Sequence, residues 1–269
     1  SADFRRDLHR FKKRITKQNI NKNYYIPNYL CYGQNEIDDC KTFDIEVKNF
    51  YKTGSVRIAN FFEHIKRNQI ELNKNKYDLC LISEAAYNLN AKLGENTEEE
   101  GFANMVKYTI KYAKDKNLKF IFAKKRYGST TYSDEEMDFF KKYLSISEYK
   151  FLNENINKKI DEYSSYAPLF QSKVAIGTQS TLLKDKISCK EKILSLNLTK
   201  TNIYDFPIKG VCAIKNCSYE KFKERLDKIF SMSYDEYFSD LDKKYNYVIE
   251  NSKSENVIDK IRKNIIKNL

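Results

Sequence analysis

The chain has few of the residues that interrupt or cross-link a fold. Its 269 residues contain three prolines, seven glycines and six cysteines. No segment approaches the roughly 18 consecutive apolar residues that a membrane-spanning helix needs. Charged side chains occupy the first 25 residues, where a secretory signal would be apolar. We therefore expect a cytoplasmic protein.

The sequence also has few residues arranged to bind a metal or to form disulfides. Histidine occurs only at positions 9 and 64, and the cysteines are scattered without the spacing of metal ligands. Several cysteines lie inside apolar runs, as small buried residues do. The sequence therefore predicts no metal site and no bound cofactor.

The net charge of +12 is concentrated at the two ends. Residues 1–25 carry a net +6 and residues 251–269 a net +3, so only +3 remains for the sequence between them. Basic ends suit peripheral contact with the anionic inner face of the plasma membrane. Solvated helix faces in a lysine-rich protein explain them equally well. Because no recognised nucleic-acid motif accompanies the charge, we expect no nucleic-acid partner.

From residue 78 onward, apolar runs of strand length alternate with segments of helical period. This alternation is typical of a parallel sheet covered on both faces, so the sequence predicts an α/β fold with a Rossmann-like doubly wound sheet and extra N- and C-terminal helices. Strands are expected at 78–83, 118–123, 149–152, 173–176, 192–196 and 211–214, with helices at 101–116, 135–143, 163–170, 180–186 and throughout 219–269. Upstream, the pattern predicts a helix at 4–19, strands at 24–32 and 47–51, and a helix from Arg57.

Ligands of open α/β sheets bind beyond the carboxyl ends of the strands, which directs attention to the turn after the strand at 173–176. A glycine ends this strand, and small hydroxyl and amide residues open the next helix. Unpaired backbone N–H groups and the helix dipole favour an anion there, so the turn is a candidate phosphate site. The alternative is an ordinary helix cap, since serine and threonine are preferred at that position in any case. The residues of this 177–181 turn are Gly177, Thr178, Gln179, Ser180 and Thr181.

Charged residues follow two other strands at the same edge. Lys124, Lys125 and Arg126 come after the strand at 118–123 and suit a diphosphate or a sugar carboxylate, or else form a solvated basic loop. Glu84 follows the strand at 78–83 and is the candidate catalytic base, a hydroxyl ligand or an ion-pair partner.

A second glycine turn lies upstream, where Gly54 and Ser55 precede the helix that contains Arg57. A cation in the first turn of a helix opposes the helix dipole, so Arg57 indicates a ligand or a carboxylate partner. We assign Gly54, Ser55 and Arg57 as candidate contacts to a donor or acceptor substrate.

Taken in order, these segments resemble the carboxyl-terminal half of bacterial surface-carbohydrate glycosyltransferases of the GT-B fold, which include capsule and lipopolysaccharide enzymes. The resemblance covers roughly residues 25–200, and its most specific part is the small-residue turn followed by Ser180-Thr181-Leu182. It implies that the 177–181 turn, Lys124 and Arg126 bind the donor phosphates, without a metal. The matching segments are 29–33, 47–51, 54–57, 78–84, 124–126 and 174–183.

The resemblance implies a domain organisation and a reaction. Residues 1–45 would be a shortened acceptor-side segment, 46–230 the nucleotide-sugar-binding domain and 231–269 C-terminal helices. A sugar would pass from the nucleotide donor to a glycan or lipid-linked acceptor. The sequence departs from the family at two points: Asp185 stands near the place of the usual ribose-binding glutamate, and the acceptor domain is mostly missing.

Two other functions stay open at the level of sequence. Polyol-phosphate transferases of the teichoic-acid kind resemble the same arrangement and use a CDP-polyol, although only His9 and His64 exist to serve as their acid and base. A non-catalytic scaffold or nucleic-acid-binding module is the third alternative.

Overall fold

The computed structural model describes residues 25–84, 98–124, 131–159, 161–250 and 257–266. The chain divides into two compact units: one is formed by residues 1–70 together with 243–269, and the other by residues 71–242. This division places the segment 46–70 with the C-terminal residues, whereas the sequence-based boundaries at 45 and 230 joined it to the sheet domain. The helix expected at 4–19 lies outside the described residues.

The larger unit, residues 71–242, contains a sheet of five strands that are all parallel, in the order β4-β3-β5-β6-β7. In chain order this is 2-1-3-4-5, the flavodoxin-like variant of the doubly wound fold. The predicted fold class is therefore confirmed. The direction of winding reverses between β3 and β5, and this switch point is where such sheets bind ligands. The strands are β3 (Tyr77–Ile82), β4 (Phe120–Ala123), β5 (Ser172–Gly177), β6 (Lys192–Asn197) and β7 (Ala213–Lys215).

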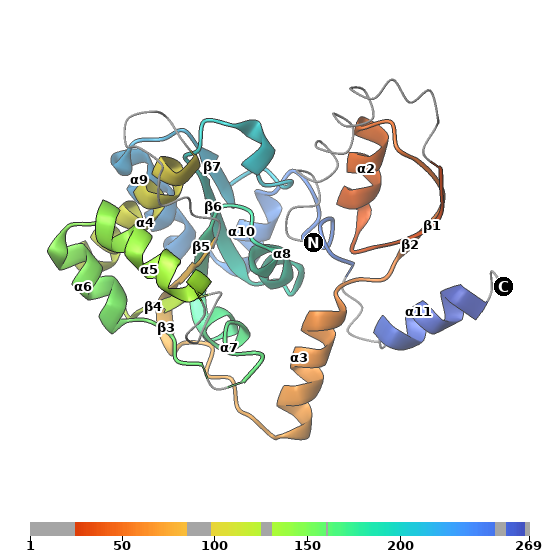
Figure 1. The fold of residues 1–269 in the computed structure, drawn as a ribbon, viewed down its shortest axis with the longest axis horizontal. Coiled ribbons are helices and arrows are strands. Elements are labelled where there is room, and N and C mark those ends of the chain that lie inside the picture. The colour runs from red at the N-terminus through yellow and green to blue at the C-terminus, as the bar shows by residue number, and fades with distance from the viewer. Residues whose placement is uncertain (1–24, 85–97, 125–130, 160, 251–256, 267–269) are drawn as a thin grey trace. The chain divides into compact units, whose positions relative to one another are not determined.

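Helices cover both faces of this sheet. Figure 1 shows α4 and α9 on one side of the strands and α8 and α10 on the other. Every residue of β4 and β6 is buried, as in a sheet covered on both faces, which explains why the strands contain apolar runs rather than an alternating pattern. The helices of this unit are α4 (Glu98–Asp115), α5 (Thr131–Tyr143), α6 (Ile146–Glu154), α7 (Tyr166–Phe170), α8 (Thr181–Ser188), α9 (Tyr219–Ser231) and α10 (Tyr234–Ser239), with a short 3-10 helix at Asn202–Tyr204.

The strand expected at 149–152 is wrong, because these residues lie in helix α6. Ser145 caps the helix by accepting a hydrogen bond from the backbone N–H of Glu148, whose side chain accepts one from the N–H of Ser145 in return. This reciprocal cap starts a helix. The short apolar run that suggested a strand is one helix face, and its Phe151 ring packs against Phe120 with centroids 5.4 Å apart.

The prediction of helix throughout residues 219–269 is correct only in part. Helices α9, α10 and α11 (Val257–Ile266) are present, but residues 240–250 are not helical.

The helix α2 (Gln34–Thr42) was not predicted. It lacks a side-chain cap and its apolar positions are few, so the sequence carries little helical signal there.

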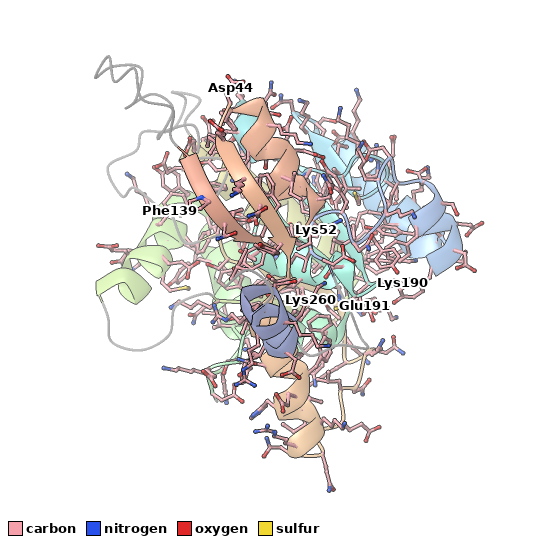
Figure 2. All side chains as sticks on the ribbon, turned by 90° about the vertical axis from the view of Figure 1, so that its right-hand side faces the viewer. Asp44, Lys52, Phe139, Lys190, Glu191 and Lys260 are labelled. Carbon is pink, nitrogen blue, oxygen red and sulfur yellow. The ribbon has the colours of Figure 1, made fainter. Side chains whose placement is uncertain are left out.

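The smaller unit contains a parallel pair of strands, β1 (Tyr25–Cys31) and β2 (Glu46–Lys52), joined through α2. Cys40, Ile45 and neighbouring apolar side chains form the core between helix and strands. Figure 2 labels Lys52 at the end of β2 and Asp44 just before its start, and Asp44 makes the turn into this strand with a φ of 53°. Helix α3 (Val56–Arg67) follows, capped by Ser55.

Candidate functional site

The switch point between β3 and β5 brings two predicted site elements together. Because Leu81 of β3 pairs with Ile176 of β5, the residues that follow these strands lie at one edge. The backbone N–H of Thr178 donates a hydrogen bond of 2.5 Å to Oε1 of Glu84. A Cβ atom on Gly177 would lie 3.0 Å from that oxygen and 3.3 Å from Leu183. Glycine thus lets the Glu84 carboxylate lie directly against the turn.

The 177–181 turn opens helix α8 as expected, and Ser180 is its cap. The Ser180 hydroxyl accepts a hydrogen bond of 3.4 Å from the N–H of Leu182. Helix first turns leave backbone N–H groups without intrahelical acceptors, and the helix dipole favours negative charge beside them. Glu84 supplies such a charge from within the protein. Both readings of the turn, as a helix cap and as a place for an anion, agree with this geometry.

The side chain of Thr178 points into the protein. Its hydroxyl donates to the carbonyl of Leu196 at 3.3 Å and approaches the sulfur of Met105 at 3.5 Å, while its carbonyl accepts from the hydroxyl of Ser195. Only 1% of Thr178 is exposed. These contacts join β5 to β6 and to α4, so only the backbone of Thr178 faces the edge of the sheet. Gln179 is also buried.

Lys124 belongs to the same edge. It follows β4, whose Ala123 pairs with Ile82 at the end of β3, and it is buried. Its carbonyl accepts a hydrogen bond of 3.0 Å from the hydroxyl of Ser165. Arg126, the other predicted cation, lies outside the described residues.

A second carboxylate at this edge was not predicted. Glu136 of α5 is 1% exposed and accepts a hydrogen bond from the hydroxyl of Ser83, the residue between β3 and Glu84. Glu136 is in a run of acidic residues that, in the sequence, is typical of a solvated helix face. No local pattern indicates that it turns inward, because its partner is 53 residues away.

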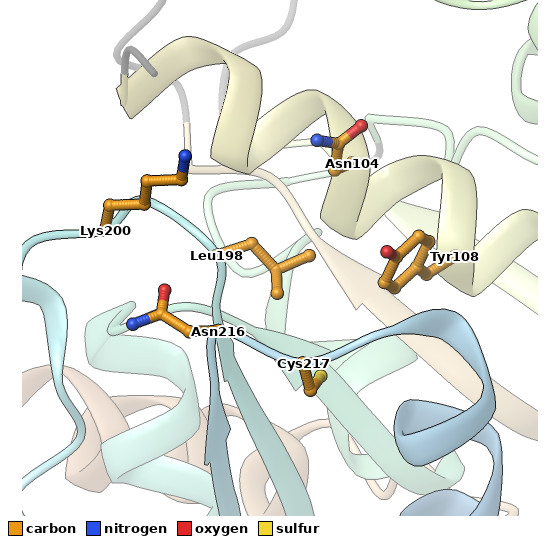
Figure 3. A pocket seen from close by; sticks show the side chains of 6 residues that line it. All are labelled: Asn104, Tyr108, Leu198, Lys200, Asn216 and Cys217. Atoms are coloured by element: carbon orange, nitrogen blue, oxygen red, sulfur yellow. The ribbon is translucent and has the colours of Figure 1, made fainter.

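A pocket with a volume of about 500 Å³ lies farther along the carboxyl edge. Figure 3 shows its lining: Leu198 and Lys200 follow β6, Asn216 and Cys217 follow β7, and Asn104 and Tyr108 come from α4. Burial raises the pKa of the Tyr108 hydroxyl and of the Cys217 thiol above their usual values. Both groups are therefore protonated at neutral pH.

Gly101 sets the spacing between two of the segments that line the pocket, α4 and the chain after β6. A Cβ atom on Gly101 would lie 2.7 Å from backbone atoms of Leu198 and Thr199, so only glycine lets α4 pack this closely on the chain after β6. The rule that ligands bind at carboxyl ends of strands applies equally to β6 and β7. The sequence carries no turn signal after these strands comparable to that at residue 177, and the pocket was therefore missed.

Gly54, Ser55 and Arg57 belong to the smaller unit. Gly54 has a φ of 82°, and a Cβ atom there would collide with the carbonyl oxygen of Glu250. Ser55 is buried and caps α3. Arg57 is exposed in the first turn of that helix. Gly54 and Ser55 thus have local structural roles, in a unit separate from the switch point.

Asp185, the candidate ribose ligand, is fully buried in α8. Its Oδ2 accepts a hydrogen bond of 2.8 Å from the hydroxyl of Tyr166 in α7. The structure therefore places Asp185 between two helices rather than at the edge of the sheet.

Within the described part of the chain, no cluster of three or more histidine, cysteine or acidic side chains could hold a metal ion. None of the described helices is long and apolar enough to cross a membrane. The site and sheet define a Rossmann-like α/β class. No protein-family model and no curated protein matches the sequence.

Proposed function

We propose that this chain binds a nucleotide-sugar and takes part in transferring the sugar to a bacterial surface polysaccharide, of a capsule or a lipopolysaccharide. The observation that carries the proposal is the carboxyl edge of the sheet, where the switch-point turn lies two strands from an open pocket. Topological switch points with glycine turns are the usual place for nucleotides in this class of fold.

In this proposal the donor phosphates occupy the 177–181 turn. Backbone N–H groups, the α8 dipole, Lys124 and Arg126 neutralise their charge, so the reaction needs no metal. A phosphate that takes the N–H of Thr178 displaces the carboxylate of Glu84. Once released, Glu84 is the proposed base that accepts the proton of the acceptor hydroxyl. The acceptor is a glycan or a lipid-linked glycan, and the proposed location is the cytoplasmic face of the plasma membrane, with the basic ends in peripheral contact.

A ligand screen by thermal unfolding tests the proposal. The chain is heated with UDP-, GDP-, CDP- and CMP-linked sugars and, separately, with a CDP-polyol. A ligand at 100 times its dissociation constant adds about 2.7 kcal/mol to the unfolding free energy. A stabilisation by one nucleotide-sugar that is reduced in Lys124→Met is the expected result.

The matched control is Lys150→Met, which replaces a lysine on α6 whose side chain is 74% exposed. It should leave the ligand response unchanged. A response to the CDP-polyol alone would favour polyol-phosphate transfer, and the absence of any response would contradict both kinds of transferase.

A further inference from the structure

The pocket after β6 and β7 shares no residue with the predicted site. It lies at the same carboxyl edge of the sheet as the switch point. The hydroxyl of Thr178 donates a hydrogen bond to the carbonyl of Leu196 in β6. The N–H of Asn216, just after β7, donates one to the carbonyl of Asn197 at 2.9 Å. Neighbouring strands are about 4.8 Å apart, so the end of β7 lies roughly 10 Å from the end of β5. One small ligand can span that distance.

The lining of the pocket is suited to hydroxyl groups. The carboxamides of Asn104 and Asn216 can each donate and accept hydrogen bonds, and the Tyr108 hydroxyl can do both. Figure 3 shows Leu198 between these polar groups, where it offers an apolar surface. The six lining residues include one lysine and no carboxylate.

Packing of neighbouring side chains and of the backbone fixes the lining of the pocket. The Tyr108 ring packs against Phe222 and Tyr219, with centroids 5.9 Å and 5.6 Å away. Gly101 sets the distance between α4 and the chain after β6. A preformed set of donors and acceptors loses little entropy when a ligand binds.

We propose that this pocket binds the hydroxyl-bearing ring of a phosphorylated ligand, through Asn104, Tyr108 and Asn216. The inference rests on the proposed function, in which the phosphates of the same ligand lie at the 177–181 turn. The ring is either the ribose of the nucleotide or the sugar itself, since both present the same hydroxyl chemistry.

Calorimetric titration of the full chain tests this assignment. The probes are the four nucleoside monophosphates, a set of hexose 1-phosphates and inorganic phosphate. Tyr108→Phe removes one hydroxyl and keeps the packed ring, Asn104→Ala suits a helix, and Asn216→Gly suits the φ of 46° at that position. Tyr149→Phe on α6 is the matched control. Thermal unfolding of each variant shows that it is folded.

Each of the three variants should weaken a ring-bearing probe by about 3- to 10-fold, as expected for one hydrogen bond, and leave inorganic phosphate binding unchanged. If the variants lower the affinity for the nucleoside monophosphates, the ring is ribose. If they lower the affinity for the hexose phosphates, the ring is the sugar. Ring-bearing probes that bind all three variants as tightly as the unaltered chain would overturn the inference and leave the proposed function standing. Failure of every probe to bind the unaltered chain would also overturn it, whereas the proposed function fails only if intact nucleotide-sugars fail too.

Discussion

Glu84 accepts a hydrogen bond from the backbone N–H of Thr178, so a carboxylate of the protein lies at the turn where a ligand phosphate is expected. Gly177 allows this close approach because it has no Cβ atom. The N–H of Thr178 is therefore bound by an anionic group of the protein itself.

Replacing Glu84 should have opposite effects on binding and turnover. In Glu84→Ala the N–H of Thr178 is freed and a negative charge is removed, so pyrophosphate should bind on the order of tenfold more tightly, about 1.4 kcal/mol for a charge-assisted hydrogen bond. Sugar transfer should be lost if Glu84 is the base. Calorimetry with pyrophosphate and a transfer assay measure the two effects. Glu154→Ala, an exposed glutamate on α6, is the control. Unchanged pyrophosphate affinity in Glu84→Ala would contradict competition at the turn.

Lys186 should make stability rise with pH in the alkaline range. Its ammonium is fully buried and donates to the carbonyls of Leu169 and Ser172, and burial lowers its pKa from 10.5 to about 8. Between these two values the unfolded chain binds a proton that the folded chain does not. Stability therefore increases with pH across this window, and below pH 8 the full cost of the buried charge remains.

Urea unfolding at pH 7, 9 and 10 checks this effect against Lys186→Met. The difference in unfolding free energy between the unaltered chain and the variant should shift in favour of the unaltered chain as pH rises. Cysteine and tyrosine ionisation affects both proteins and largely cancels in the comparison. A difference that stays constant from pH 7 to 10 would refute the lowered pKa.

Tyr166 should matter for stability and not for nucleotide binding. Tyr166→Phe removes the hydrogen bond to the buried carboxylate of Asp185, which should cost about 2 kcal/mol. If Asp185 held a ribose, the same variant would alter nucleotide affinity. Thermal unfolding and nucleotide titration, side by side, separate the two roles, with Tyr149→Phe as a control for loss of a tyrosine hydroxyl.

Gly101→Ala should destabilise the chain and distort the pocket. The added methyl group meets the backbone of Leu198 and Thr199, which cannot move away as a flexible side chain would. Overpacking of this kind costs about 1–3 kcal/mol. Thermal unfolding measures the loss, and Lys107→Ala, on the same helix, should change stability by less. Equal stability in Gly101→Ala would show that α4 can shift.

The sequence predicted the sheet well because its strands are short, have mostly apolar centres and are separated by helical segments. The prediction failed at 149–152, where a short apolar run is compatible with a strand or a helix. There the Ser145–Glu148 cap favours the helix. The sequence could place Glu84 and the 177–181 turn at one edge, since both follow parallel strands. It could not foresee that they touch, or that Glu136 lies beside Ser83, because such contacts depend on the register of strands and on helix packing far apart in sequence.

The smaller unit is discontinuous in sequence. The N–H of Glu250 donates to the carbonyl of Tyr32 at 2.7 Å, the N–H of Asn35 donates to the carbonyl of Tyr247, and Gly54 makes room for the carbonyl of Glu250. During synthesis, residues 25–70 are made before the larger unit, but they meet these partners only after the whole of that unit has been made. The smaller unit therefore starts before the larger one and is completed after it, and a ribosome paused before residue 243 would hold a fully synthesised larger unit and an incomplete smaller one.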